Sequence, residues 1–344
     1  MAPWRRHAAI AGGAGAVAMM LVSGAALAQL QDRGKFTELY AAAKKEGQVI
    51  IWGTQRREVD WIPAAFGRLF SGIDVQFLGD NDIAVKAIAE ARAGRHQVDV
   101  YQSSLTGILP VVQRDLLTNV DWSAFGIDAR NIAFEGRMAY TSNIVYTVAY
   151  NNKLAKDVDA PKNWMDVLDE RYKGKGVSST FLLPRLIGGL GLAWGDDKAL
   201  QFARDIVAKA NLLLTRAPRE SLLQSGERVY AFGEIDSLIR AVAAEGLPVG
   251  QVVPEPVVVG QFGATIMKNA PHPNAGKLLI DFLTSEEGQK TLADVEYIPA
   301  MPSVPAKTPS VKPEGGGFKA NVLSPDTITR NLDNWYKLKK ELFN

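Results

Sequence analysis

Short apolar runs alternate along the chain with segments whose apolar residues recur every three or four positions. The first part contains three such runs, which predict buried strands at residues 48–52, 74–78 and 98–101. Between them, helical spacing of apolar residues, as at Ile62, Phe66 and Leu69, predicts helices. This alternation is typical of a parallel sheet covered by helices and indicates an α/β fold.

Two β-rich runs differ from this pattern. The longest is residues 143–150 (NIVYTVAY), and the other is residues 256–261. Residues 264–267, after a glycine-containing turn, predict a separate short strand. His272-Pro273-Asn274 then predicts the start of a helix, and a final amphipathic helix is predicted from Ile328, Leu332, Trp335 and Leu338.

Shorter elements are predicted between the two long runs. Strands are expected at residues 176–178 and 229–232, and apolar residues at 200–207 predict a helix between them. A length of 344 residues and a hydrophobic content of 47% suit two α/β lobes better than one small core.

Three segments resemble the periplasmic solute-binding proteins of bacterial ABC importers, in the branch that includes the ferric-ion-binding proteins. They are YNNKLAKDVDAPKNWMDVLDERYKGK (150–175), LLQSGERVYAFGEIDSLIRAVAAEGLPVGQVVPE (222–255) and NAPHPNAGKLLIDFLTSEEGQ (269–289). The resemblance implies a two-lobed, type II (Venus-flytrap) fold with two hinge-crossing strands, at residues 143–150 and 256–261.

The resemblance also implies a division of the chain. We expect residues 29–146 and 256–300 to form the first α/β lobe, and residues 147–255 to form the second. Residues 301–344 are expected to pack back across both lobes.

The N-terminus has the pattern of an export signal. Arg5 and Arg6 precede an apolar stretch at residues 8–26, and Ala26-Leu27-Ala28 fits a cleavage site, so we predict a signal peptide over residues 1–28 that is cut after Ala28. A membrane anchor is the alternative, although the stretch is rich in glycine and alanine and only weakly apolar. We therefore expect an exported, periplasmic protein.

Composition narrows the classes of function. Lys and Arg total 39 and Asp and Glu total 37; loss of Arg5 and Arg6 with the signal peptide leaves 37 of each, so the mature chain is formally neutral. A neutral chain has no overall attraction for nucleic acid or an anionic membrane. Because the chain contains no cysteine, disulfides and thiolate nucleophiles are excluded.

Polar residues follow four of the predicted strands. In parallel α/β sheets, ligands bind at the carboxyl ends of strands beside helix N-termini, where exposed N–H groups attract anions. The candidate ligand-binding residues at these junctions are Thr54, Gln55, Arg56, Ser103, Ser104, Ser179, Thr180 and Asp236. Ordinary helix capping, which uses the same residue types, is the alternative.

The resemblance departs from the ferric-binding pattern at the residues that hold the metal. Those proteins use an adjacent tyrosine pair, and the matching stretch here, AFGEIDSLIRAV, contains none; the position that resembles their ligand histidine is Arg56. Phenolate is the hard anionic donor that Fe³⁺ prefers, so we expect no metal ligand and a small organic anion as solute. A guanidinium such as that of Arg56 suits a carboxylate or phosphonate.

The predicted function is therefore the substrate-binding component of an ABC importer, which delivers a small solute to an inner-membrane permease. We expect a monomer with no cofactor, no catalytic residue and no nucleic-acid partner. The alternatives are a ferric-ion-binding protein of the same fold, a ligand-loaded partner of a sensor, and an exported hydrolase. A hydrolase would depend on His96 or His272, the histidines that remain after processing, and both fit structural roles better.

Overall fold

The computed structural model describes residues 36–54, 56–80, 82–307 and 321–343. The predicted signal peptide, its cleavage site and Gln55 lie outside the described residues. Among the described helices, none is both long enough and apolar enough to cross a bilayer.

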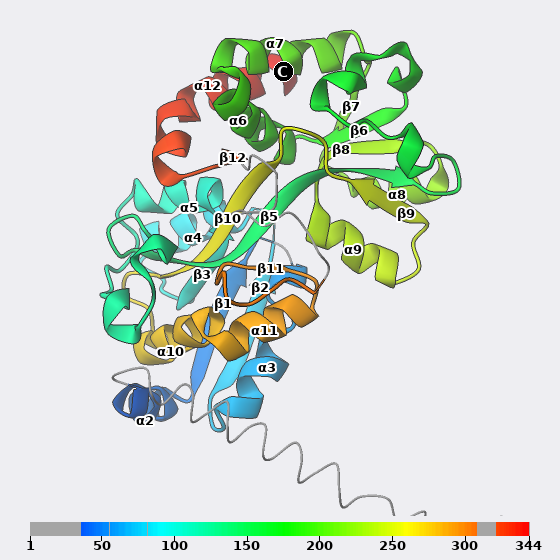
Figure 1. The fold of residues 1–344 in the computed structure, drawn as a ribbon. Coiled ribbons are helices and arrows are strands. Elements are labelled where there is room, and N and C mark those ends of the chain that lie inside the picture. Colours follow the sequence, from blue (N-terminus) through cyan, green and yellow to red (C-terminus); the bar gives the residue numbers. More distant parts are fainter. Residues whose placement is uncertain (1–35, 55, 81, 308–320, 344) are drawn as a thin grey trace, which may run out of the picture.

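Two groups of strands and helices are joined by the long strands β5 (Met138–Asn151) and β10 (Val258–Ile266), which run between them (Figure 1). We call the group around β1 the first lobe and the group around β6 the second lobe. The strands of the first lobe are β1 (Gln48–Gly53), β2 (Asp74–Gly79) and β3 (Val100–Ser104). Its main helices are α2 (Phe36–Glu46), α3 (Ile62–Leu69), α4 (Ile83–Arg92), α5 (Leu105–Val112), α10 (Pro273–Thr284) and α11 (Glu286–Asp294).

The second lobe has a smaller sheet with its own helices. Its strands are β6 (Gly176–Ser179), β7 (Leu213–Thr215), β8 (Tyr230–Ile235) and β9 (Val249–Val252). Its helices are α6 (Leu182–Trp194), α7 (Asp196–Ala208), α8 (Arg219–Ser225) and α9 (Asp236–Ala244). Short 3₁₀ helices are found at Arg56–Glu58, Trp122–Phe125, Ala129–Asn131, Asp157–Asp159, Trp164–Leu168 and Glu170–Tyr172.

The strand order is β2-β1-β3-β10-β5-β8-β6-β7, so the two crossing strands occupy the centre. The short strands β4 (Ile132–Ala133) and β11 (Ile298–Pro299) pair with β5, as does β9, and β12 (Asn321–Val322) pairs with β10. One half of β5 pairs with β10, and its other half pairs with β8 and β9. A single strand therefore belongs to the sheets of both lobes.

Strand directions make the carboxyl ends of the two sheets face each other. β1 and β3 are parallel, β10 is antiparallel to β3, and β5 is antiparallel to β10, so β5 runs in the same direction as β3. β8 is antiparallel to β5, and β6 is parallel to β8. The strands of the first lobe thus end toward the second lobe, and β6 and β8 end toward the first.

The register gives the separation of these ends along β5. Ser104 and Ser142 both pair with Phe262, while Ile235 pairs with Tyr146. The end of β3 is therefore level with Ser142 of β5, and the end of β8 is level with Tyr146. These positions are four residues apart, which corresponds to roughly 13 Å along the strand.

Apolar packing is partly separate in the two lobes and partly shared. One cluster, which includes Phe66 and Phe282, is confined to the first lobe and the parts of β5 and β10 that pair there. Another, which includes Val177 and Ile239, is confined to the second lobe and β5. A third cluster continues from Tyr101 through the crossing strands to α6 and α7, so the lobes are not packed as independent cores.

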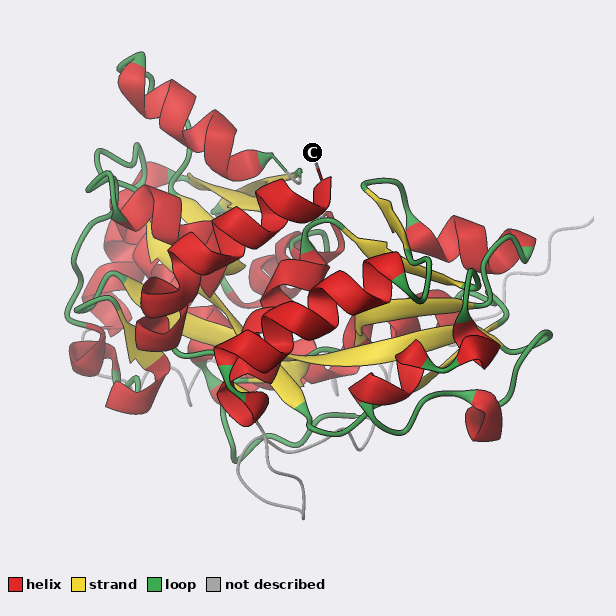
Figure 2. Ribbon diagram, turned by 90° about the horizontal axis from the view of Figure 1, so that it is seen from above, coloured by secondary structure: helices red, strands yellow, loops and turns green. Residues whose placement is uncertain are grey.

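The C-terminal helix α12 (Pro325–Phe343) contacts helices of both lobes, namely α5 on one side and α6 and α7 on the other. Arg204 of α7 forms an ion pair with Glu341 of α12, with Nε 2.5 Å from Oε1. In Figure 2 this helix, which ends at the label C, lies on the outside of the molecule beside other helices.

Several predicted elements have different ends in the structure. Residues 264–267 do not form a separate strand, because β10 continues through a shift in register at Phe262 and Gly263. β3 continues through Ser104 because Ser103 and Ser104 pair with β10. β8 likewise ends at Ile235 rather than at residue 232, because it pairs with β5.

Candidate functional site

The candidate site is the region where the strands of the two lobes end toward each other, here called the inter-lobe junction. On the first-lobe side, Thr54 follows β1 and Ser103 lies near the end of β3. Their hydroxyl oxygens are 2.7 Å apart, within hydrogen-bonding distance. The parallel pairing of β1 with β3, in which Gly53 is level with Gln102, produces this contact. These two predicted residues are brought together.

Ser104 is occupied by the helix that follows. Its side chain accepts a hydrogen bond from the backbone N–H of Gly107 at 3.3 Å and caps α5, and its hydroxyl is 3.0 Å from that of Thr106. A Cβ at position 107 would clash with the Ser103 hydroxyl, so glycine there leaves room for that group. The capping alternative therefore describes what Ser104 does in this structure.

Arg56 is the most exposed of the predicted residues that the structure describes. Its side chain is 77% exposed and has a loose ion pair with Asp60, with Nε 3.8 Å from Oδ2. Its guanidinium carbon is 5.5 Å from the centre of the Phe77 ring on β2. An exposed guanidinium with such weak contacts is available to a ligand at the first-lobe edge.

On the second-lobe side, Ser179 accepts hydrogen bonds from the backbone at the start of a helix, and Thr180 contacts β7. The Ser179 hydroxyl accepts hydrogen bonds from the backbone N–H groups of Phe181 and Leu182, at 3.1 and 3.3 Å, at the start of α6. The backbone N–H of Thr180 donates to the carbonyl of Thr215 at 3.1 Å.

Asp236 is buried at the first position of α9, and its carboxylate accepts hydrogen bonds from Arg240 and from the backbone of β5. Arg240 donates to its Oδ2 at 2.7 Å, and the backbone N–H of Val145 on β5 donates to its Oδ1 at 3.4 Å. Burial raises the pKa of Asp236, and the Arg240 guanidinium opposes that rise without cancelling it. Arg240 also donates to the carbonyl of Glu296 at 2.9 Å, which links the second lobe to the segment after α11.

A second buried ion pair lies nearby on β8. Arg219 donates to both carboxylate oxygens of Glu234, at 2.7 and 2.9 Å, and the two side chains are 11% and 2% exposed. Burial opposes the charge of Arg219, but its contact with Glu234 raises the pKa of the guanidinium overall. The guanidinium of Arg219 therefore has a carboxylate partner within the protein, Glu234.

Two further ion pairs join the lobes beside the junction, and no sequence pattern predicted them. Arg57 donates to both carboxylate oxygens of Glu245 at the end of α9, at 2.5 and 2.6 Å. Arg216, which follows β7, donates to Asp82 at the start of α4 at 3.3 Å. The partners are separated by 188 positions in the first pair and by 134 in the second. Local sequence patterns could therefore not have predicted these pairs.

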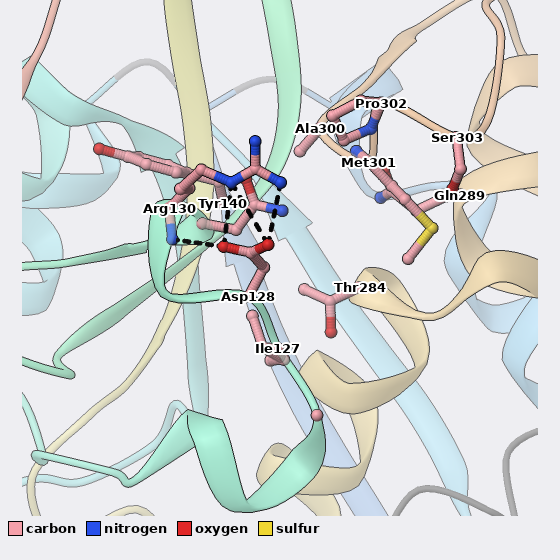
Figure 3. A pocket seen from close by; sticks show the side chains of 12 residues that line it. Ile127, Asp128, Arg130, Tyr140, Thr284, Gln289, Ala300, Met301, Pro302 and Ser303 are labelled. Atoms are coloured by element: carbon pink, nitrogen blue, oxygen red, sulfur yellow. Dashed lines mark hydrogen bonds and ion pairs between the residues drawn. The ribbon is translucent and has the colours of Figure 1, made fainter.

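A separate pocket of about 370 Å³ lies in the first lobe, and none of the predicted residues lines it. Figure 3 shows Asp128 and Arg130 joined by hydrogen bonds and an ion pair beside Tyr140 of β5, with Met301 and Ser303 on the other wall. Arg130 Nη2 is 3.0 Å from Asp128 Oδ2.

His272 lies beside Asp99 and takes part in structural contacts. Its Nδ1 is 2.9 Å from Asp99 Oδ2, its Nε2 is 2.9 Å from the Gln48 amide nitrogen, and its backbone N–H donates to Asp99 Oδ1 at 2.7 Å. Among the residues that the structure describes, no hydroxyl hydrogen-bonds to this ring. The contacts fasten the start of α10 to β1 and to the segment before β3.

Comparisons with known proteins agree on one kind of protein. The sequence profile of the family described as bacterial extracellular solute-binding protein matches residues 61–316. A periplasmic protein of Salmonella typhi, named for the binding of 2-aminoethylphosphonate, is 24% identical over 289 residues, which cover 77% of this chain and 79% of the relative.

Solved structures share the fold at lower identity. An ABC transporter substrate-binding protein of Bradyrhizobium japonicum superposes with a TM-score of 0.70 at 18% identity, over 87% of this chain and all of the other. The iron-bound HitA protein of Pseudomonas aeruginosa superposes with a TM-score of 0.69 at 18% identity, over 86% of this chain and 99% of the other. These likenesses confirm the predicted two-lobed fold.

Proposed function

We propose that this chain, which belongs to the family of bacterial extracellular solute-binding proteins, is the substrate-binding component of an ABC importer. It captures a small organic anion at the inter-lobe junction and delivers it to a permease in the inner membrane. The observation that carries this proposal is the opposite direction of the strands in the two sheets. The carboxyl ends of β3 and β8 point toward each other beside the crossing strands β5 and β10. Closure of the lobes on the solute then produces the surface that the permease recognises.

An anionic solute is supported by the chemistry at the junction. The helices α5, α6 and α9 begin at the strand ends, and their first N–H groups carry partial positive charge. The Salmonella typhi relative is named for a phosphonate, which is a small anion of this class. Thr54, Ser103 and Arg56 supply hydroxyl and guanidinium donors on the first-lobe side.

Ferric iron is the second candidate, because a solved structure of the same fold holds it. Iron would need phenolate ligands, and the stretch that matches the tyrosine pair of the ferric-binding proteins, AFGEIDSLIRAV, contains no tyrosine. We therefore place the organic anion first.

Export and processing complete the proposal. The protein is periplasmic after cleavage behind Ala28, acts as a monomer and performs no chemistry. The alternative role, as the ligand-loaded partner of a sensor, would use the same closed lobes. Uptake of the bound solute by cells that carry the permease would indicate transport rather than sensing.

Isothermal titration of the mature protein, residues 29–344, tests the proposal. The panel contains 2-aminoethylphosphonate, carboxylates, sulfonates, sugar phosphates, neutral polyols and Fe³⁺. We expect saturable binding of an oxyanion-bearing solute. Ser103→Ala should weaken it by roughly 10- to 100-fold, the value of a hydrogen bond to a charged group, while Ser225→Ala on the exposed side of α8 should not.

Each other result has a definite reading. Tight Fe³⁺ binding with a visible charge-transfer band would favour the iron alternative. Binding of neutral polyols alone would remove the anion from the proposal, and conversion of the solute to a product would replace a binding protein with a hydrolase.

A further inference from the structure

Arg185 lies in the first turns of α6, where this helix packs on the crossing strands. One turn further along, a Cβ on Gly189 would clash with Val258 Cγ1 of β10, so the helix backbone lies directly against that strand. A Cβ on Gly233 of β8 would lie 3.1 Å from Leu186 Cδ2. Arg185, on the same helix face as Gly189 and next to Leu186, is therefore close to the wall formed by β5, β8 and β10.

The side chain of Arg185 is directed toward the first lobe. Side chains on a helix tilt toward its N-terminus, and α6 begins at the end of β6 that faces the first lobe. Its charge acts on two tyrosines in that direction: Tyr101 on β3 and Tyr146 on β5. Burial raises both pKa values, and the Arg185 guanidinium opposes the rise at both. Arg185 is thus within electrostatic reach of β3 in the first lobe and of the crossing strand β5.

Arg185 differs from the other half-buried arginines of the second lobe. Arg219 is paired with Glu234 and Arg240 with Asp236. Arg185 is also only half-exposed, yet within the described part of the chain it has no hydrogen bond and no carboxylate within ion-pair distance. A partly desolvated guanidinium gains from an anionic partner, because burial removes part of the water that would otherwise solvate its charge.

We propose that Arg185 binds the oxyanion group of the solute directly and thereby selects carboxylates, phosphonates or phosphate esters over neutral solutes. This inference rests on the proposed function and adds the residue that neutralises the ligand. A planar guanidinium presents paired N–H donors that match two oxygens of such a group. The rings of Tyr101 and Tyr146, both about 1% exposed, exclude water from one side and strengthen the pair.

The test compares Arg185→Gln and Arg185→Lys with the wild-type protein by isothermal titration, using 2-aminoethylphosphonate and the oxyanions of the panel above. Removing one partner of a desolvated charge pair weakens binding by roughly 30-fold or more. Arg185→Gln should show that loss. Arg185→Lys should recover part of it, because lysine keeps the charge but not the planar fork. Arg204→Gln on exposed α7 is the matched control and should bind like the wild type.

Thermal unfolding without ligand separates binding from a structural role. We expect Arg185→Gln to unfold at or above the wild-type temperature, since it removes a partly buried charge that has no ion-pair partner among the described residues. Equal oxyanion affinity in the wild type and Arg185→Gln would overturn this inference and leave the proposed function intact. Lower stability together with unchanged affinity would assign Arg185 to packing and overturn it as well. Failure of the wild type to bind any oxyanion would overturn both proposals.

Discussion

The two sides of the inter-lobe junction hold their polar groups in different ways. On the first-lobe side, the Thr54 and Ser103 hydroxyls bond to each other and Arg56 is largely in solvent. On the second-lobe side, Glu234 and Asp236 are buried and each is neutralised by an arginine of its own lobe.

The difference separates adaptable contacts from rigid ones. A hydroxyl pair contributes about 0.5–1.5 kcal/mol, so it can exchange its partner for a ligand at little cost. A buried ion pair that loses one member costs about 3–5 kcal/mol. We infer that the first-lobe side rearranges around the solute, while the second-lobe side keeps its geometry and presents Arg185.

The largest expected effect comes from breaking a pair on the rigid side. Arg219→Leu leaves the Glu234 carboxylate buried without a partner and should lower the free energy of unfolding by about 3–5 kcal/mol in urea titrations. Arg204→Leu, which breaks the exposed pair with Glu341, is the control and should leave the urea midpoint unchanged. Wild-type stability of Arg219→Leu would mean that the two sides do not differ in rigidity.

The next effect concerns the wall between the two sides. Gly189→Ala forces a methyl group into Val258 of β10 and should cost about 1–3 kcal/mol through overpacking. Adding Val258→Ala removes the obstructing methyl groups, so the double variant should be more stable than the sum of the two single changes predicts. Strictly additive losses in urea unfolding would show that α6 does not rest on β10 at this point.

The pH dependence of the free energy of unfolding tests the raised pKa of the buried Asp236 carboxyl. Because burial raises the pKa of Asp236 above its ordinary value of 3.8, the folded state binds this proton more tightly than the unfolded state does. The contribution of Asp236 to the free energy of unfolding is fully present below its pKa in the unfolded state. It is lost as pH rises through its pKa in the folded state, with a slope of at most about 1.4 kcal/mol per pH unit. Asp236→Asn should remove that slope in urea titrations made upward from pH 4. Identical slopes in both proteins would contradict the assignment.

The smallest effect is expected at the exposed pair that joins the lobes. Glu245→Gln releases Arg57 and should weaken solute binding a few-fold at low salt by making closure less favourable. The difference should vanish near 1 M salt, where the Debye length is about 3 Å. Glu90→Gln, which breaks an exposed pair with Arg95 inside the first lobe, is the control and should not alter affinity. A salt-independent loss would indicate direct ligand contact instead.

Local sequence patterns were sufficient for most elements of the fold. The apolar run at 143–150 lies within β5, and the helical spacing at the end of the chain lies within α12. The ends of β3, β8 and β10 were misplaced, because pairing with a distant strand lengthened each of them.

The candidate site was only partly predictable. Strand-end polarity pointed to Thr54 and Ser103, which the sheet brings into contact. The same pattern pointed to Ser104, whose side chain caps α5, and to Ser179, whose side chain accepts backbone hydrogen bonds at the start of α6. A capping serine and a ligand-binding serine have the same local sequence, so only their contacts distinguish them.

The sequence alone determined the order of helices and strands, because periodicity and turn residues act over a few positions. Tertiary structure decided which arginines form ion pairs within the protein and which have no carboxylate partner among the described residues. Nothing in the local sequence separates Arg185 from Arg219, yet Arg219 forms an ion pair with a buried carboxylate, whereas the charge of Arg185 acts on two tyrosines. Coulomb interactions and desolvation depend on distances in space between residues far apart in the chain, and folding sets those distances.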